Sequence, residues 1–531
     1  MSRRAALVQT VAGIMSSNVQ WSSSSLPENL HNVEKLEDTE MHEEKNHHID
    51  QDDDLDFDLP HFIQPFPANI SAGDLQYLQL KGVLAFPPLA VQDAFIDAYI
   101  RHVQPRFHLI SVTDLYRMVN HRNETGQEIS LLLYDAVLYA AAAFVDLRFI
   151  HNAGYASRRI ARKHLYDKTR LLYNISYEKD HLVVVQSLLL LAGWYQTPSE
   201  HKDSWYWVGL AISTAQSIGL DKDQTEQTES SIARTQLGRR VWWSCLMHDR
   251  LIALGLRYPS RLKEEDYDVD MLHETDFEIH GLVEHGTARS SFLGQYINQL
   301  PQLASICIAR AKLCVLIGEV LQEQYFILPC HDPTPDTTKR SVLLSPRKKF
   351  DNYDSAGLIY SDLCNWMREL PYSCHSNGHL KPAADAEKTP ASLQGILLQM
   401  EFYTTVSALF RPYISQTFKN KTYLSIQDQK SCRNRVRDAA TEVTRLLTNL
   451  KQSDLYRYMP STGVSITVSA AVVHFADVIG FPSSNHGKAL ACFQLCIVVL
   501  DRLREIYVEA DYASNYLSNI SKTTTRSACI V

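Results

Sequence analysis

Two apolar segments rich in tryptophan, residues 205–220 and 239–251, constrain the fold of this chain more than any other part of its sequence. In the first, apolar side chains recur every three or four residues, which is the period of an α-helix. Gly219 stands where a helix C-cap favours a left-handed residue, and Leu220 is placed to be its hydrophobic partner. The second segment is apolar on almost all sides, as expected for a helix covered by neighbours. Together they predict a helical body with buried indole rings.

The composition allows a large core, because 45% of the 531 residues are apolar and 21% are charged. The periodic segments are nearly all helical, and the alternation typical of β-strands is scarce. No internal repeat of fixed period occurs, which argues against a regular solenoid. We therefore predict an all-α fold: one large, irregular array of mostly antiparallel helices with a disordered acidic N-terminal arm.

The domain boundaries follow from changes in composition along the chain. Residues 1–88 combine serines, an acidic run and closely spaced prolines, with too little apolar surface to offset the entropy of ordering, and we predict a disordered arm. We expect a helical core at 89–328, a connector loop at 329–350 that is rich in Pro, Thr, Asp and Ser, and a C-terminal helical part of the same domain at 351–515. Residues 516–531 are predicted to be a disordered tail.

Charge is concentrated in the arm. Residues 28–58 hold thirteen acidic and two basic residues, a net charge of 2 − 13 = −11, whereas the whole chain has −8. The remainder therefore carries −8 − (−11) = +3. Non-specific affinity for nucleic acid comes mainly from Lys and Arg that neutralise phosphates, so this balance predicts no broad attraction of the body for DNA.

Part of the arm, residues 52–62, alternates acidic residues with Leu55, Phe57, Leu59 and Phe62. This pattern is typical of disordered activation segments, although a solvated acidic linker would have the same composition. The run 52–56 also fits the D-D-x-x-D pattern that helical terpene cyclases use to hold magnesium. The second magnesium motif of those enzymes is absent downstream, and no phosphate loop, dinucleotide fingerprint or nucleophile elbow occurs. We predict no enzyme activity, no cofactor, and no catalytic, cofactor-binding or metal-binding residue.

The cysteines and the apolar stretches indicate an intracellular protein without a membrane span. Ten cysteines lie at spacings that suggest no disulfide framework, and no signal peptide opens the chain. Pairs on one helix face, 307 with 314 and 492 with 496, lack the four ligands of a structural zinc site and are interpreted as core cysteines. The stretches 131–150, 182–197 and 464–481 are too short or too charged for a bilayer, and we interpret them as buried helices.

The tryptophan segments also carry the pattern of a known family. The first contains W-x-x-x-G-x-A-x-x-x-A-x-x-x-G-L and the second R-R-x-W-W-x-x-x-x-x-D-R. Here these positions are Trp205, Gly209, Ala211, Ala215, Gly219, Leu220, Arg239, Arg240, Trp242, Trp243, Asp249 and Arg250. Both patterns resemble the regulatory, or middle homology, domain of fungus-specific transcription factors of the zinc binuclear cluster family. The resemblance extends to the segments 103–108, 185–190, 265–270, 370–371 and 409–413, and to Cys432 with the pair 439–440.

The chain departs from the family pattern at three places. His108 stands where the family usually has a proline, and the usual Gly-Arg-Pro is loosened to residues 255–259. Neither change removes a buried hydrophobe, so we interpret both as variation in loops. The third departure is larger: the six-cysteine zinc cluster is missing, since the first cysteine is Cys245.

The resemblance implies a transcriptional regulator of a fungal metabolic or secondary-metabolite gene set, acting in the nucleus. The expected partners are the transcriptional machinery or a DNA-binding partner protein, and DNA is reached indirectly or through a missing N-terminal module. A small-molecule effector and a homodimer remain open, and no membrane partner is expected. A helical interaction scaffold without DNA binding, or a magnesium-dependent helical enzyme, would be alternatives.

Two groups of charged residues each have a functional and a structural interpretation. Arg239, Arg240, Asp249 and Arg250 flank the tryptophan pair and could bind a ligand or partner. Arginines near buried indoles also stack on rings and pair with carboxylates, which fixes helix orientation without any ligand, and we favour this structural role. The run 347–349, Arg-Lys-Lys, could be a short nuclear-import signal or simply a basic loop.

Overall fold

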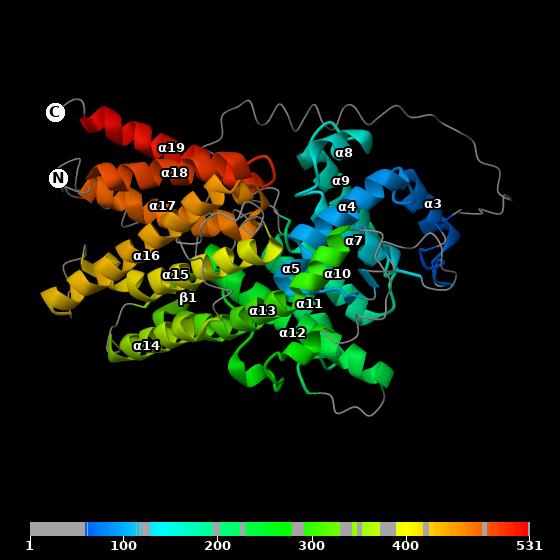
Figure 1. Ribbon diagram of the computed structural model, residues 1–531, viewed down its shortest axis with the longest axis horizontal. Coiled ribbons are helices and arrows are strands. Elements are labelled where there is room, and N and C mark those ends of the chain that lie inside the picture. Colours follow the sequence, from blue (N-terminus) through cyan, green and yellow to red (C-terminus); the bar gives the residue numbers. More distant parts are fainter. Residues whose placement is uncertain are drawn as a thin grey trace.

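The structure, a computed structural model, describes residues 59–528 except 61, 69, 113, 116–117, 119–127, 195–201, 224–228, 279–290, 330–341, 348–352, 372–388, 418–423 and 481–485. Over these residues the chain folds into α-helices, short 3-10 turns and one two-stranded sheet. The predicted all-α array of mostly antiparallel helices is confirmed (Figure 1). Most of the predicted acidic arm, residues 1–58, lies outside the described residues.

The first tryptophan segment forms α11 (Ser204–Ser217), which ends as the sequence predicts. Gly219 has a left-handed φ of 74°, and its N–H donates to the carbonyl of Gln216. The N–H of Leu220 donates to the carbonyl of Ala215 at 3.0 Å. These two bonds form the Schellman arrangement, which satisfies carbonyls at the helix end that have no partner within the helix.

The second tryptophan segment lies within α12 (Glu229–Leu256), a longer helix than the apolar run alone indicates. Trp242 and Trp243 are buried, with 0% and 2% exposure, and Trp207 of α11 is also fully buried. The predicted burial of these indole rings is confirmed.

The N-terminal part of the body runs from α3 to α13. It consists of α3 (Ala72–Leu80), α4 (Leu89–His102), α5 (Gln104–Phe107), α7 (Leu131–Ala141), α8 (Leu147–Asn152), α9 (Arg158–Asn174), α10 (His181–Leu191), α11, α12, the 3-10 turns η2 (Glu264–Asp266) and η3 (Glu274–Phe277), and α13 (Ser291–Gln324). The apolar helices α7 and α10 pack against each other at its centre, with α4, α9 and α11 around them.

The C-terminal part follows α13 in the chain. It consists of β1 (Tyr325–Pro329), β2 (Val342–Pro346), α14 (Tyr353–Glu369), α15 (Pro390–Thr417), α16 (Ile426–Gln452), the 3-10 turn η7 (Leu455–Tyr458), α17 (Ser461–Gly480), α18 (His486–Leu503) and α19 (Val508–Ala528). Neighbours in this series pack against each other, and α15 with α16 and α17 with α18 form the most extensive pairs.

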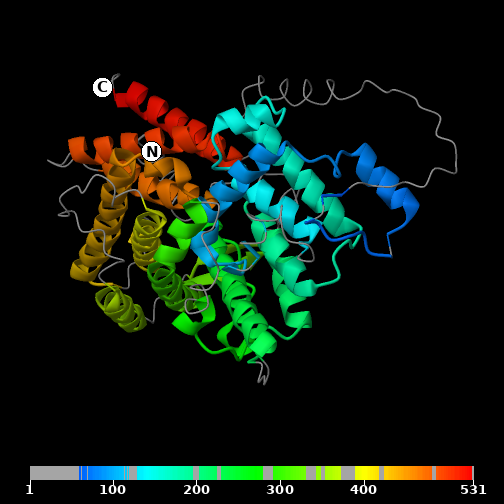
Figure 2. The ribbon, with the colours of Figure 1, turned by 45° about the vertical axis from the view of Figure 1, so that its right-hand side comes forward.

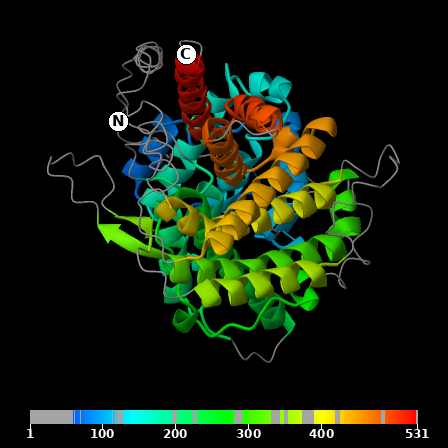
Figure 3. The ribbon, with the colours of Figure 1, turned by 90° about the vertical axis from the view of Figure 1, so that its left-hand side faces the viewer.

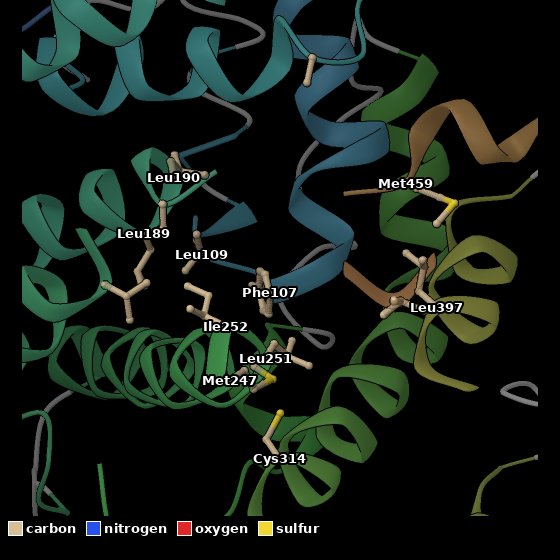
Figure 4. Packing of buried hydrophobic residues seen from close by; sticks show 14 of the residues in the cluster. Phe107, Leu109, Leu189, Leu190, Met247, Leu251, Ile252, Cys314, Leu397 and Met459 are labelled. Atoms are coloured by element: carbon tan, nitrogen blue, oxygen red, sulfur yellow. The ribbon is translucent and has the colours of Figure 1, made fainter. Parts of the chain in front are cut away.

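The long helix α13 joins the two parts. It packs against α12 and α4 of the N-terminal part and against α14 and α15 of the C-terminal part. Figure 2 shows the two parts side by side, and Figure 3 shows α13, α14, α15 and α16 stacked on the C-terminal side. Figure 4 shows the junction from close by, where Phe107 of α5, Leu251 of α12, Cys314 of α13 and Leu397 of α15 contribute to one apolar interior.

Residues 59–88 differ from the predicted disorder. Phe62 and Ile63 are buried in the core, and α3 begins with a reciprocal cap in which Ser71 and Asp74 bond to each other's backbone N–H groups. The prediction rested on the average composition of the arm, in which a few apolar residues such as Phe62 and Ile63 carry little weight. Both of these residues lie in the core of the helical body. The spacing Ser-x-x-Asp is a helix-start signal that the sequence carried.

The connector and the tail also differ from prediction. Residues 342–346 of the connector form β2, which pairs antiparallel with β1, and the N–H of Leu344 donates to the carbonyl of Arg257 at 2.8 Å. An apolar run, Val-Leu-Leu, lies within this polar stretch and explains the strand. Residues 516–528 continue α19. The apolar face of this helix packs on the body, and Leu517 is therefore only 2% exposed.

The three apolar stretches form helices of the body. The first two correspond to α7 and α10, which are shorter than a bilayer span. Among the described residues, α17 is the one helix long and apolar enough to cross a membrane, and 56% of that window is buried inside the protein. Its packing against α12, α15, α16, α18 and α19 favours the predicted core role.

Candidate functional site

The residues of the family pattern gather in one region, which we call the tryptophan corner: α11, α12 and the segment 257–278 that folds back on them. Trp205 donates from Nε1 to the carbonyl of Pro259 at 3.0 Å, and the guanidinium of Arg261 lies 3.5 Å from the centre of its ring. A Cβ placed on Gly209 would lie 2.6 Å from Arg261 Cζ. Gly209 therefore makes room for the stacked guanidinium.

Asp249 of α12 fixes the start of the returning segment. Its carboxylate accepts hydrogen bonds from the Ser260 hydroxyl and from the backbone N–H groups of Arg261 (3.0 Å) and Leu262 (3.3 Å). The Arg250 guanidinium lies 3.5 Å away and also donates to the carbonyl of Leu262. Burial raises the pKa of Asp249, and the hydrogen bonds from Ser260 and the backbone oppose that rise. The Asp249 carboxylate thus holds residues 260–262 against α12.

The two arginines that begin the R-R-x-W-W pattern hold the turn η3. Arg240 donates to the Asp276 carbonyl and to the Glu278 carboxylate, both at 2.8 Å. Arg239 pairs with the Asp276 carboxylate at 3.1 Å and with Asp223 at 3.4 Å. Both guanidiniums thus have carboxylate partners within the protein, as the favoured structural interpretation predicts.

The tryptophan pair packs on the same returning segment. Trp243 donates from Nε1 to the carbonyl of Asp270 at 2.8 Å, whereas Nε1 of Trp242 is buried and has no hydrogen-bond partner among the described residues. Both rings pack against Tyr267, at 5.8 Å for Trp242 and 6.0 Å for Trp243. The corner is thus a packed joint between two helices and a loop.

A second charged region lies where the two parts of the body meet, and we call it the arginine seam: Arg106, Arg159, Arg162 and Arg310 with their partners in the C-terminal part. Arg106, at the short helix α5, reaches into the C-terminal part. Its Nη2 lies 2.9 Å from the Glu401 carboxylate of α15 and donates to the Thr462 hydroxyl of α17, also at 2.9 Å.

Arg310 of α13 approaches the same carboxylate from its other oxygen. Its Nε lies 3.0 Å from Glu401 Oε2, and its remaining nitrogens donate to the Arg106 carbonyl (2.9 Å) and to the side-chain oxygen of Gln394 (3.1 Å). The side chains of Arg310 and Glu401 are 0% and 1% exposed, and that of Arg106 is 7% exposed. Two buried guanidiniums therefore share one carboxylate.

The seam continues along α9. Arg162 donates to the carbonyl of Ile506 at 2.7 Å and to that of Gly193 at 3.0 Å. Arg159 contacts the Asp511 carboxylate of α19. Arginine side chains that meet carbonyls and carboxylates thus add polar contacts to the apolar junction between the two parts.

His108 lies between the corner and the seam. It is 1% exposed, has a left-handed φ of 50°, and its Nδ1 lies 2.7 Å from the hydroxyl of Tyr296. Burial, with the charges of Arg240 and Arg310, lowers its pKa to about 3, so the ring is neutral. His108 lies in the turn after α5, as the interpretation of loop variation implies, but its burial in the core was not expected.

Sequence reasoning found the corner and missed the seam. The corner residues stand in local patterns, whereas Arg106 meets a carboxylate 295 positions further along the chain. Two local signals marked this turn: the resemblance of residues 103–108 to the family pattern, and the unusual His108, two positions after Arg106. No periodicity could identify Glu401 or Thr462 as the partners.

The other sequence candidates give no site in the described part of the chain. No group of three or more His, Cys, Asp or Glu side chains there could hold a metal ion. Cys307, Cys314 and Cys496 are buried, as predicted for core cysteines, and Cys492 is half-buried. The acidic run 52–56 and the basic residues 348–349 lie outside the described residues. Arg347 donates to the carbonyl of Gln322 at 2.9 Å.

The tryptophan corner lies within a stretch of sequence that matches a known family. Residues 96–355 match the family model described as the fungal specific transcription factor domain. This stretch contains the tryptophan corner and the N-terminal side of the seam. The chain thus belongs to the family of fungal specific transcription factor domains, as its sequence patterns predicted.

Individual relatives extend the similarity beyond that stretch. The chain is 39% identical over 471 residues to "Cutinase transcription factor 1 beta" of Fusarium vanettenii. This alignment covers 88% of this chain and 53% of the relative. It is 29% identical to "Transcription factor cpaR" of Aspergillus oryzae, over 88% of this chain and 77% of the relative. The chain spans about half the length of several curated relatives that it matches.

A solved structure, "Structure of the K. lactis CBF3 core", superposes with a TM-score of 0.45 at 12% identity, covering 86% of this chain and 90% of that one.

Proposed function

We propose that this chain is the regulatory body of a fungal transcription factor that controls a metabolic gene set and acts in the nucleus. It reaches DNA through a partner protein or through a DNA-binding module outside these 531 residues. The proposal rests above all on the 39% identity to a cutinase transcription factor over 88% of the chain. The net charge of only +3 outside residues 28–58 supports an indirect route to DNA, since non-specific affinity for phosphates grows with an excess of Lys and Arg over acidic residues.

The experiment that tests this proposal compares transcripts with and without the gene. A regulator shifts a discrete set of transcripts when the gene is deleted, and the intact gene restores them. An interaction scaffold leaves them unchanged, and that result would overturn the proposal. A gene that encodes the Arg240→Leu variant should fail to restore these transcripts, because Arg240 holds the turn η3 of the corner through Asp276 and Glu278. Arg234→Leu is the matched control, because Arg234 forms an exposed ion pair with Asp180.

The route to DNA needs a separate measurement. We expect the purified chain to bind duplex DNA only weakly, without sequence preference, and with an affinity that falls as salt rises. Tight, sequence-specific, metal-dependent binding by this polypeptide alone would contradict indirect association while leaving the regulatory role intact.

We also propose that the chain is not an enzyme, since the relatives it matches carry the names of transcription factors. A magnesium-dependent turnover that Asp53→Ala abolishes would contradict this.

A further inference from the structure

The acidic segment 52–62, whose pattern is typical of activation segments, runs directly into the core of the body. Of its hydrophobic residues, Leu59 packs against the core and Phe62 is only 6% exposed. Leu55 and Phe57 lie outside the described residues. An activation segment acts by placing such side chains in an apolar groove of a partner. Two of these hydrophobic side chains are therefore engaged by the body itself.

Residues 59–60 and 62–66, which we call the strap, pair with the body at one position of the chain. The N–H of Ile129 donates to the carbonyl of Phe62 at 2.8 Å, and the N–H of Gln64 donates to the carbonyl of Ile129 at 3.0 Å. These two bonds form an isolated parallel bridge between Ile63 and Ile129, just before α7. The backbone pairing of the strap is thus short compared with a strand in a continuous sheet.

Aromatic side chains hold the strap on both sides of this bridge. The ring of Phe62 meets the ring of Tyr134 edge-on, with 5.3 Å between the ring centres. The hydroxyl of Tyr177 donates to the carbonyl of Gln64 at 3.2 Å, and the ring of Phe66 packs edge-on against the Tyr177 ring at 6.1 Å. The strap therefore binds a surface formed by α7 and the segment after α9.

The same hydrophobic side chains cannot occupy the core of the body and the groove of a partner at one time. Binding to a partner thus requires the strap to leave the body, and a partner shifts this equilibrium by the difference in its affinity for the two states. Five aspartates lie among residues 52–58, directly before the strap. Their charge favours a groove whose rim is basic.

We propose that the strap is a switch, in which Leu59 and Phe62 bind either to the body of this chain or to an apolar groove with a basic rim on a coactivator protein. While the strap lies on the body, Leu55 and Phe57 are the hydrophobic residues of the segment left for a partner. Release of the strap adds Leu59 and Phe62 to them. The role in transcription rests on the proposed function, whereas the opening of the strap does not.

The test joins the full chain to a heterologous DNA-binding module and measures a reporter gene in fungal cells. Ile129→Pro removes the N–H that donates to the Phe62 carbonyl and leaves every side chain of the strap unchanged. Reporter activity should rise about fivefold, because the loss of one hydrogen bond shifts an equilibrium by about that factor. Ile129→Ala is the matched control, since it removes more of the side chain but keeps the N–H, and should stay close to the wild type. Equal activity of the two variants would overturn the proposal.

A further variant tests whether the raised activity comes from the released side chains. In the Ile129→Pro background, Leu59→Ala combined with Phe62→Ala should return the reporter to the wild-type level or below it. Raised activity that persists without these two side chains would contradict the assignment.

Hydrogen exchange of the purified wild-type chain follows the strap without a reporter. The amides of Gln64 and Ile129 should exchange together and faster than those within α7 and α10, because local opening costs less free energy than opening of the core. Exchange of these two amides as slow as that of α7 would overturn the proposal, and this measurement decides if Ile129→Pro does not fold.

The outcomes for the strap and for the proposed function can be told apart. Shifted transcripts after gene deletion, with equal reporter activity of the two Ile129 variants, would overturn the switch and leave the regulatory role intact. Unchanged transcripts, with fast exchange of Gln64 and Ile129, would overturn the proposed function and leave the opening of the strap intact.

Discussion

The tryptophan corner and the arginine seam use the same residue types for different tasks. In the corner, Arg240 meets its partners 36 and 38 positions away, and Asp249 meets Ser260 eleven positions away. In the seam, Arg106 meets Glu401 across 295 positions and Thr462 across 356. In the corner, Arg239, Arg240 and Arg250 contact different carboxylates, whereas in the seam Arg106 and Arg310 share one. The hydrogen bonds and ion pairs of the corner thus form within one stretch of sequence, whereas those of the seam connect stretches that are far apart in the sequence.

The largest expected effect is at the carboxylate of the seam. Glu401→Ala leaves Arg106 and Arg310 buried without an anion, and we expect the free energy of unfolding to fall by about 3–5 kcal/mol. Urea denaturation of the wild type and of Glu401→Ala measures this difference in the free energy of unfolding. The triple variant with Glu401→Leu, Arg106→Met and Arg310→Met should be closer to the wild type, because apolar side chains of similar volume need no desolvation of charge. A triple variant less stable than Glu401→Ala would show that the seam depends on contacts other than charge.

A smaller effect is expected where the two regions meet, at His108. Its pKa is lowered to about 3 in the folded protein, from an ordinary value near 6.5. Between these values the unfolded chain binds a proton that the folded chain does not, so the stability that neutral His108 contributes is lost as the pH falls. Relative to His108→Gln, the wild type should lose about 1 kcal/mol for each pH unit from 6 to 4. Parallel pH curves from urea denaturation would show that burial and the charges of Arg240 and Arg310 do not lower the pKa of this ring.

The smallest effect separates the two indoles of the corner. Trp242→Phe and Trp243→Phe remove similar volumes, but within the described part of the chain only Trp243 of the pair donates a hydrogen bond, to the carbonyl of Asp270. Trp243→Phe should therefore destabilise the protein by about 1 kcal/mol more than Trp242→Phe in urea denaturation. If Trp242→Phe costs more, ring packing rather than hydrogen bonding controls the stability of the corner.

The same contrast explains how much the sequence could predict. The helical period of residues 205–220 and the left-handed Gly219 are local properties, and both were predicted correctly. The early core residues Phe62 and Ile63 were missed, because an average over a polar arm conceals a few apolar side chains. The seam was missed because the charge on Arg106 says nothing about which carboxylate, hundreds of residues later, will meet it.

The separation of Arg106 from its partners also has a consequence during biosynthesis. The stretch that matches the family model ends at residue 355, but the acceptors for Arg106 and Arg310 are supplied by Gln394, Glu401 and Thr462. At about 5–20 residues per second, a ribosome adds those acceptors roughly 15–70 s after Arg106 is made. Until then the emerging helices hold cations that cannot yet be buried. The smallest unit able to mature on its own is therefore larger than the stretch that the family model matches.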